Sequence, residues 1–282
     1  MIGLGARRCP LEFRAAEKTL HGAVFAAGGA AVLTASSDRT ARLWDAASGA
    51  PLATFEHPAP VWDAQESPDG DRILTAAEDG RARVWDARTG ELRLELVGHE
   101  GGVRCARFYR AGERILTSSE SRWDASVRLW DAGSGAELAL LRAEGARPIS
   151  VSLDPSGRFA LTGSWWGDAE LWDLESETLV RAWRAHGSHV VGASFSPDGL
   201  RLLTSSSSPV GRLWDLRDGA EQMTLDDGRH IPSFAEFSPD GRWILSASGL
   251  GRIRLWPADP LARARELVTH ELTEAERARL GL

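Results

Sequence analysis

Residues 61–97 read VWDAQESPDGDRILTAAEDGRARVWDARTGELRLELV, and this stretch decides the fold. It contains four short runs with strand character, at 61–67, 72–76, 82–85 and 92–96, and the last two alternate apolar and polar side chains with a period of two. Between the runs stand Pro68-Asp69-Gly70, Glu78-Asp79-Gly80 and Thr89-Gly90. These are turn sequences, because proline presets a negative φ and glycine accepts a positive one. The stretch therefore predicts four antiparallel strands joined by tight turns.

The same pattern recurs six times along the chain. A tryptophan marks the third run of each unit, at Trp44, Trp85, Trp130, Trp172, Trp214 and Trp256, in steps of 41, 45, 42, 42 and 42 residues. A turn glycine precedes the tryptophan by 15 residues in five units and by 18 in the third, which carries a three-residue insertion. A four-stranded sheet of this size cannot bury both faces alone, and stacking such sheets radially solves the problem. The repeat predicts an all-β protein, a β-propeller.

In these repeats the chain resembles the WD40-repeat family over roughly residues 20–256, and the alanine-rich, almost lysine-free composition suggests a bacterial type. The resemblance implies a buried network in each blade. Its members are a histidine before the blade, a serine or threonine on the second strand, an aspartate in the next turn, and the tryptophan. The second and third repeats hold the complete set: His57, Thr75, Asp79 and Trp85, then His99, Thr117, Asp124 and Trp130.

The other four repeats depart from this network. The first has Thr34, Asp38 and Trp44 without a matching histidine, and the fourth has Thr162 and Trp172 with Trp166 in place of the aspartate. The fifth has His186, Thr204 and Trp214 with Ser208 for the aspartate, and the sixth has Ser246 and Trp256 with Leu250 there. These departures leave the predicted fold unchanged but suggest altered blades at positions four to six.

The predicted domain organisation is a propeller of six four-stranded blades over residues 1–257 and a short helical tail over 258–282. Pro257 cannot continue a strand ladder, so the sixth repeat lacks its fourth strand. In the family an N-terminal strand usually completes the last blade, and Pro10–Phe13 aligns with Pro51–Thr54. We therefore expect a closing strand near residues 10–15, with a seventh blade supplied by a partner or a second copy as the alternative. For the tail, Asp259-Pro260 and Thr273–Glu276 are helix-start signals.

Composition limits the possible partners. The chain has 33 basic and 40 acidic side chains, a net charge of −7, which argues against a nucleic acid held by bulk charge. No apolar run reaches the 18 residues that a membrane helix needs, so we expect no membrane association. Cys9 and Cys105 cannot form a disulfide framework, which favours a cytoplasmic protein.

The repeat explains the motifs that could otherwise suggest a catalytic or a metal site. His186 and His189 lie at a loop-to-strand junction without further metal ligands. Gly163–Gly167 lacks the setting of a nucleophile elbow, and a strand follows Gly249–Gly251 where a phosphate loop needs a helix. We therefore predict no catalytic residue, no cofactor and no metal. The expected function is a noncatalytic scaffold or sensor that binds a protein or peptide, as a monomer or as a subunit of a hetero-complex. The alternatives are an enzyme using the central channel, and a subunit of a signalling or defence complex whose catalytic part is a separate chain.

The resemblance also predicts a partner site on one rim of the propeller. In the family, residues that flank the start of the first strand, and the residue before the turn aspartate, face outward there. Here these positions and their neighbour hold tryptophan and arginine in the second to fourth repeats: Trp62, Arg104, Trp123, Arg147, Trp165 and Trp166. These two residue types dominate interface hot spots. The alternative is that these tryptophans pack on one another or on the tail.

Overall fold

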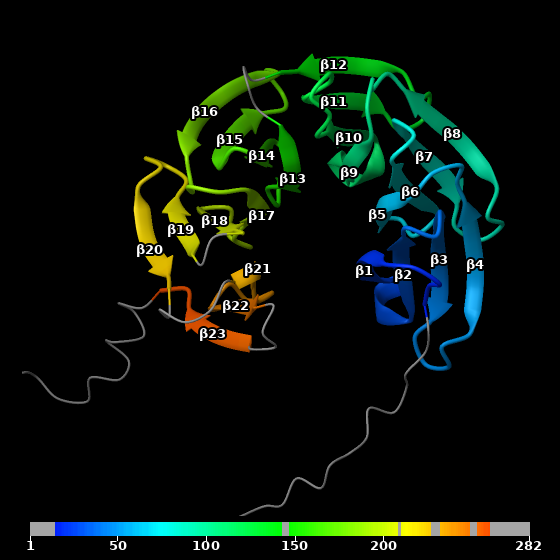
Figure 1. Ribbon diagram of the computed structural model, residues 1–282, viewed down its shortest axis with the longest axis horizontal. Coiled ribbons are helices and arrows are strands. Elements are labelled where there is room, and N and C mark those ends of the chain that lie inside the picture. The colour runs from blue at the N-terminus through cyan, green and yellow to red at the C-terminus, as the bar shows by residue number, and fades with distance from the viewer. Residues whose placement is uncertain (1–14, 143–146, 208–209, 227–231, 249–252, 260–282) are drawn as a thin grey trace, which may run out of the picture.

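Six antiparallel sheets follow one another along an arc in the computed structural model, which describes residues 15–142, 147–207, 210–226, 232–248 and 253–259 (Figure 1). Within each sheet the strands follow chain order, from an inner strand to an outer one. Contacts between the sheets run through the inner strands, each of which packs on the inner strand of the next sheet. This is the sheet arrangement predicted from the repeat.

The first three sheets hold twelve strands. The first sheet contains β1 (Leu20–Ala26), β2 (Ala31–Ser36), β3 (Thr40–Asp45) and β4 (Pro51–Glu56). The second contains β5 (Val61–Glu66), β6 (Arg72–Ala77), β7 (Arg81–Asp86) and β8 (Leu92–Val97). The third contains β9 (Val103–Tyr109), β10 (Arg114–Ser119), β11 (Ser126–Asp131) and β12 (Glu137–Leu141). Short 3-10 turns, η1 (Ala27–Gly29) and η2 (Arg110–Gly112), connect the first two strands of the first and third sheets.

The remaining sheets continue the series. The fourth contains β13 (Pro148–Leu153), β14 (Phe159–Ser164), β15 (Asp168–Asp173) and β16 (Thr178–Arg184). The fifth contains β17 (Val190–Phe195), β18 (Arg201–Ser206), β19 (Gly211–Asp215) and β20 (Glu221–Leu225). The sixth contains β21 (Pro232–Phe237), β22 (Trp243–Ser248) and β23 (Ile253–Pro257).

The predicted strand content is confirmed in five sheets, which have four strands each, while the described part of the sixth has three. The predicted closing strand falls on residues 10–15, of which 10–14 lie outside the described residues. The predicted helical tail over 258–282 is likewise outside them, except for Ala258 and Asp259, which are not helical. Both elements remain predictions.

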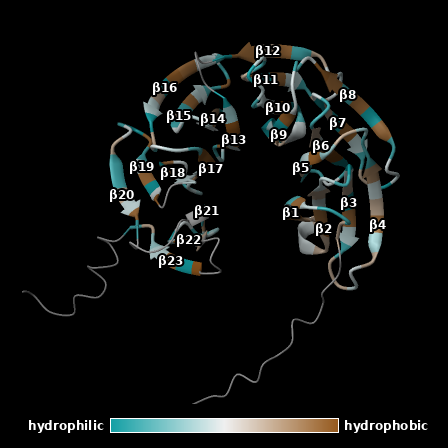
Figure 2. Ribbon diagram, viewed as in Figure 1, coloured by the Kyte–Doolittle hydropathy of each residue, from teal (hydrophilic) through white to brown (hydrophobic). Residues whose placement is uncertain are grey.

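The hydrophobic core lies between neighbouring sheets. Hydrophobic and hydrophilic segments alternate along individual strands, as on β8 in Figure 2. Trp85 of the second sheet packs in one cluster with Leu33 and Phe55 of the first. Trp130 of the third sheet packs with Leu74 and Val84 of the second in the same way. These repeat tryptophans therefore tie their own sheet to the preceding one.

The predicted network is present, with one correction in the second sheet. In the third sheet it is complete: the Trp130 indole N–H donates to Thr117 Oγ1 (2.8 Å), His99 Nε2 lies 2.8 Å from the same oxygen, and His99 Nδ1 lies 2.6 Å from Asp124. In the second sheet His57 Nδ1 contacts the carbonyl oxygen of Phe55 (3.0 Å), and Asp79 pairs with Arg83 (2.6 Å). Asp124 thus bonds His99 and also pairs with Arg128 (3.4 Å), whereas Asp79 pairs with Arg83 and His57 bonds a backbone carbonyl instead.

The fourth sheet, which lacks the histidine, fills the same place with a carboxylate. The Thr162 hydroxyl donates to Glu170 Oε2 (2.9 Å), and the Trp172 indole N–H donates to Thr162 (3.3 Å). Burial raises the pKa of Glu170, and the hydrogen bonds from Thr162 and Trp172 offset this only in part. The histidine missing from this repeat is therefore replaced by a residue of the third strand. The other five repeats have arginine at that position: Arg42, Arg83, Arg128, Arg212 and Arg254.

The two ends of the arc expose apolar side chains that are buried in the other sheets. Leu255 on β23 is 65% exposed, whereas Leu43, Val84, Leu129, Leu171 and Leu213, at the same position of the other sheets, are at most 8% exposed. Phe25 on β1 is 76% exposed, whereas Phe108, Phe195 and Phe237 are at most 9% exposed. The first and sixth sheets lie apart in Figure 1. The first and the sixth sheet therefore each expose a face that, in the other sheets, packs against a neighbouring sheet.

The buried histidines make stability depend on pH. Burial first, and then the charge of a nearby arginine, lowers the pKa of His57 and of His186 from 6.5 to about 4. The unfolded chain takes up these protons at a higher pH than the folded one, so stability is lost as pH falls from about 6.5 to 4. The loss approaches roughly 3 kcal/mol for each histidine. Thermal melting of the wild type and of His57→Gln across this range checks it, and parallel pH profiles would contradict it.

The pKa shift of Glu170 has the opposite effect on how stability depends on pH. Its folded pKa lies above the unfolded value, so the folded state is penalised at neutral pH and gains stability as pH falls toward the unfolded value. We expect Glu170→Gln, which keeps an acceptor for Thr162, to raise the unfolding free energy at pH 8. The difference from wild type should shrink at pH 5. A less stable variant at pH 8 would show that the charged carboxylate is required.

Candidate functional site

The rim, defined here as the end of the sheets where the inner strands begin and the second strands finish, carries the predicted residues. The ladder between the first two strands is irregular at this end of every sheet, because the second residue of each inner strand has no partner. Such a bulge redirects a side chain away from the ladder. The bulged residues of the first three sheets are His21, Trp62 and Arg104.

These three side chains form a stack across three sheets. The His21 and Trp62 rings are 4.1 Å apart at their centroids, and Arg104 Cζ lies 4.2 Å from the centre of the Trp62 ring. Trp62 therefore contacts a residue of the preceding sheet and a residue of the following one. Burial, and then the charge of Arg104, lowers the pKa of His21. The lowered pKa favours the neutral imidazole beside Arg104.

A second stack lies across the fourth and fifth sheets. Arg147 Cζ lies 5.3 Å from the centre of the Trp165 ring, and the His189 ring centroid is 4.0 Å from it. Trp165 follows β14, and its backbone N–H donates to the carbonyl oxygen of Arg147 (2.9 Å). The residue before the inner strand and the residue after the second strand are therefore fixed side by side. This stack repeats the combination of arginine, tryptophan and histidine.

Glu120 connects the two stacks. Its carboxylate lies 4.0 Å from Arg104 Nε, and its backbone carbonyl oxygen accepts a hydrogen bond from Arg147 Nε (2.8 Å). We call the resulting set the rim row, and it crosses five sheets. Its members, in order, are His21, Trp62, Arg104, Glu120, Arg147, Trp165 and His189.

The structure joins four of the six predicted residues in the rim row and leaves the other two outside it. Trp62, Arg104, Arg147 and Trp165 belong to the rim row. Trp123 lies in the turn lengthened by the insertion, is 71% exposed, and carries Arg122 4.4 Å from its ring centre. Trp166 is 53% exposed, and its carbonyl oxygen accepts a hydrogen bond from Arg184. The ring contacts of Trp62 and Trp165 are with histidine and arginine rather than with another tryptophan.

Sequence reasoning missed His21, His189 and Glu120 as members of the site. His21 occupies the same position of its repeat as Trp62, and His189 the same position as Arg147. Their positions were therefore readable from the repeat. The ring contacts of the two histidines were not, because His21 and His189 pair with tryptophans that are 41 and 24 positions away in another sheet.

Acidic groups on the inner strands serve contacts between sheets. Asp63 on β5 forms an ion pair with Arg107 on β9, and its Oδ2 also accepts the backbone N–H of Ala106 (3.1 Å). Glu66 accepts the backbone N–H of Ala27 (2.8 Å). Among the described residues no group of three or more histidine, cysteine, aspartate or glutamate side chains could hold a metal ion. No helix in the described ranges is long and apolar enough to cross a membrane.

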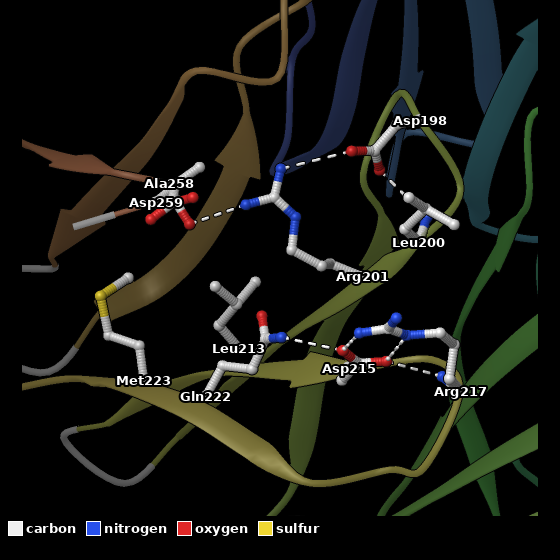
Figure 3. Close-up of a pocket in the computed structure, with 10 residues that line it drawn as sticks. All are labelled: Asp198, Leu200, Arg201, Leu213, Asp215, Arg217, Gln222, Met223, Ala258 and Asp259. Carbon is white, nitrogen blue, oxygen red and sulfur yellow. Dashed lines mark hydrogen bonds and ion pairs between the residues drawn. The ribbon is translucent and has the colours of Figure 1, made fainter. Parts of the chain in front are cut away.

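A pocket of about 600 Å³ lies between the fifth and sixth sheets, at the end opposite the rim (Figure 3). Leu213 and Met223 give it an apolar wall. Its charged groups are engaged with one another: Arg201 bonds the carbonyl oxygen of Ala258 (2.7 Å), and Arg217 pairs with Asp215 (2.7 Å). The hydrogen bonds from Arg217 lower the pKa of Asp215 to about 2. A ligand would find these side chains already partnered.

Comparisons with known proteins agree with the repeat. The family described as "WD domain, G-beta repeat" matches residues 8–45, 49–86, 90–131, 138–173, 177–215 and 222–257. The WD40 repeat protein poxJ of Penicillium oxalicum is 35% identical over 113 residues, which are 39% of this chain and 33% of the fungal protein. The same protein from strain 114-2 / CGMCC 5302 gives the same values. Both relatives are fungal, so the bacterial type remains a prediction.

The matched segments cover most of the chain, while the chain aligns with only a third of the fungal relative. Six antiparallel sheets, each with a tryptophan bonded to a hydroxyl on the second strand, are the structure that the family match requires. The protein belongs to the WD40-repeat family.

Proposed function

We propose that this protein is a noncatalytic interaction module whose rim row, together with Trp123 and Trp166, binds a protein or peptide partner. The observation that carries the proposal is the rim row itself, in which tryptophan and arginine from several sheets are assembled on one rim. WD40 repeats generally mediate protein–protein interaction. The cytoplasm, a reducing compartment, suits the free Cys105.

Trp123 is the best-placed contact residue of the set. It is the most exposed tryptophan among the large apolar side chains of the described residues, and the Arg122 guanidinium lies against its ring. An exposed indole beside a cation combines a large apolar area with a charged donor, as in interface hot spots. The three-residue insertion makes this turn longer than its counterparts in the other repeats.

We expect Trp123→Ala to weaken partner binding at least about tenfold, which corresponds to roughly 1.4 kcal/mol. Its melting temperature should stay close to wild type, because an exposed side chain contributes little to stability. Trp62→Ala should weaken binding and also lower the melting temperature, because it removes the ring that contacts both His21 and Arg104. The partner is captured from the source organism with tagged protein and identified by mass spectrometry. Titrations of that partner then measure binding, and thermal melting measures the stability of each variant.

Arg88→Ala serves as the matched control, since Arg88 is exposed in a turn at the end of the sheets opposite the rim. The control should capture the partner as wild type does. Normal binding by both tryptophan variants would place the partner site elsewhere and contradict the proposal.

We further propose that residues near 10–15 complete the sixth blade as its outer strand and close the ring. Three of the later family matches begin at or next to the outer strand of the preceding sheet: 49 before β4, 90 before β8, 177 before β16. The first match begins at residue 8, and this supports the assignment of residues 8–14 to an outer strand. Closure would also bring the exposed faces at Phe25 and Leu255 toward one another.

Deleting residues 1–14 tests this closure and retains Ala15 and Glu17, which bond Arg42 and Asp38 of the first sheet. We expect a lower melting temperature and association into larger species, because an unpaired strand edge and two apolar faces stay open. Light scattering and thermal melting measure both, with deletion of residues 1–7 as the control. A monomer that melts like wild type would show that the segment does not close the ring.

A further inference from the structure

Three arginines on the rim have guanidinium nitrogens that no carboxylate in the described part of the chain neutralises at close range. Arg104 has the 4.0 Å contact from its Nε to Glu120, and Arg147 uses its Nε for a backbone carbonyl. Arg122 lies over Trp123. Many other described arginines form closer ion pairs, such as Arg83 with Asp79 (2.6 Å). The rim therefore carries three guanidinium groups without a close carboxylate partner, on a chain of net charge −7, and Glu78 lies near His21 as a further acidic group.

The indole rings hold these guanidinium groups in place. Arg104 lies against Trp62, and Arg147 lies against Trp165. Stacking restricts the rotamers of a long side chain, and the flat face of a guanidinium can rest on a ring while its edge keeps its donors free. An incoming acceptor therefore meets donors whose ordering cost is already reduced.

Glu120 stands between the two arginines. Its carbonyl oxygen anchors Arg147, while its carboxylate stays at 4.0 Å from Arg104, beyond hydrogen-bond distance. The carboxylate is partly exposed, so it can turn toward solvent when another anion arrives. Its charge then competes with that anion for the same arginine.

We propose that the rim row recognises an anionic side chain of its partner peptide, an inference that rests on the proposed function. This side chain is a carboxylate or a phosphorylated residue. It is held between Arg104 and Arg147 in place of the Glu120 carboxylate. Guanidinium groups bind both anions through paired N–H donors. A peptide suits the site better than a nucleic acid, because the overall negative charge of the chain repels a long polyanion. Trp123 and Arg122 then contact the residues beside the anionic one.

The test uses the full chain and three short fluorescein-labelled peptides of one sequence, with glutamate, glutamine or phosphoserine at alternate positions. Anisotropy titrations should show binding of the glutamate or the phosphoserine peptide, or of both, and little binding of the glutamine peptide. The peptide that binds more tightly shows whether the anion of the partner is a carboxylate or a phosphate. Binding should weaken between about 50 and about 200 mM salt, because the contacts are partly exposed ion pairs.

The variants make the assignment specific. Arg104→Ala and Arg147→Ala should each weaken binding of the anionic peptide roughly fivefold or more. Arg104→Lys keeps the charge and should restore only part of the affinity, because lysine lacks the paired donors. Glu120→Gln should tighten binding about threefold, because it removes the competing charge but keeps the backbone carbonyl that holds Arg147. Arg88→Ala is again the matched control, and melting curves verify the fold of each variant.

Two results overturn the inference. One is equal affinity for the anionic and glutamine peptides; the other is a Glu120→Gln variant that binds no more tightly than wild type. A single-stranded RNA that binds through the same arginines as tightly as the peptides would overturn it as well. If these results occur while Trp123→Ala still loses the captured partner, the interaction function stands and only the anionic recognition fails.

Discussion

The hydrogen bond from a tryptophan indole to a hydroxyl on the neighbouring strand is the interaction on which the rest of the structure depends. It occurs in all six sheets, between Trp44 and Thr34, Trp85 and Thr75, Trp130 and Thr117, Trp172 and Thr162, Trp214 and Thr204, and Trp256 and Ser246. Such a bond contributes about 1 kcal/mol net, whereas leaving its buried donor unpaired costs more. It fixes the indole in one orientation, and in the second and third sheets the indole then packs on the sheet before it.

The second partner of the hydroxyl differs between sheets, whereas the bond from the indole to the hydroxyl is the same in all six. His57, His99 and His186 contact it through Nε2 in three sheets, and Glu170 accepts from it in the fourth. In the second sheet, Nδ1 faces a carbonyl and so must donate, which leaves Nε2 as the acceptor for Thr75. Each solution satisfies the hydroxyl, so the sheet geometry survives the loss of the histidine. This tolerance explains why the repeat departs from its pattern in the later blades without a change of fold.

The rim is built from strand positions that are not paired in the ladders. The second residue of every inner strand has no ladder partner, so its side chain is free of the core pattern and can be polar, charged or aromatic. A rigid scaffold that presents variable positions at its ends is the usual arrangement for binding sites. In this chain three successive bulges hold His21, Trp62 and Arg104, and packing between sheets turns them into one stack. The site is thus a product of neighbouring repeats and not of any single one.

The sequence by itself determined the repeat, the strand content of five sheets and the repeat positions that face the rim, because period, turn glycines and tryptophans are local signals. Strand ends in the second repeat differ from the prediction by a residue at most, as at β5 and β6. Only the tertiary structure decided which side chains meet: Asp79 joins Arg83 where His57 was expected, Glu170 takes the histidine's place, and Glu120 links two stacks. It also set Trp123 and Trp166 apart from the row. Contacts between residues in different sheets depend on how the sheets pack and on which partner is nearest for each charge, and a one-dimensional pattern does not carry that information.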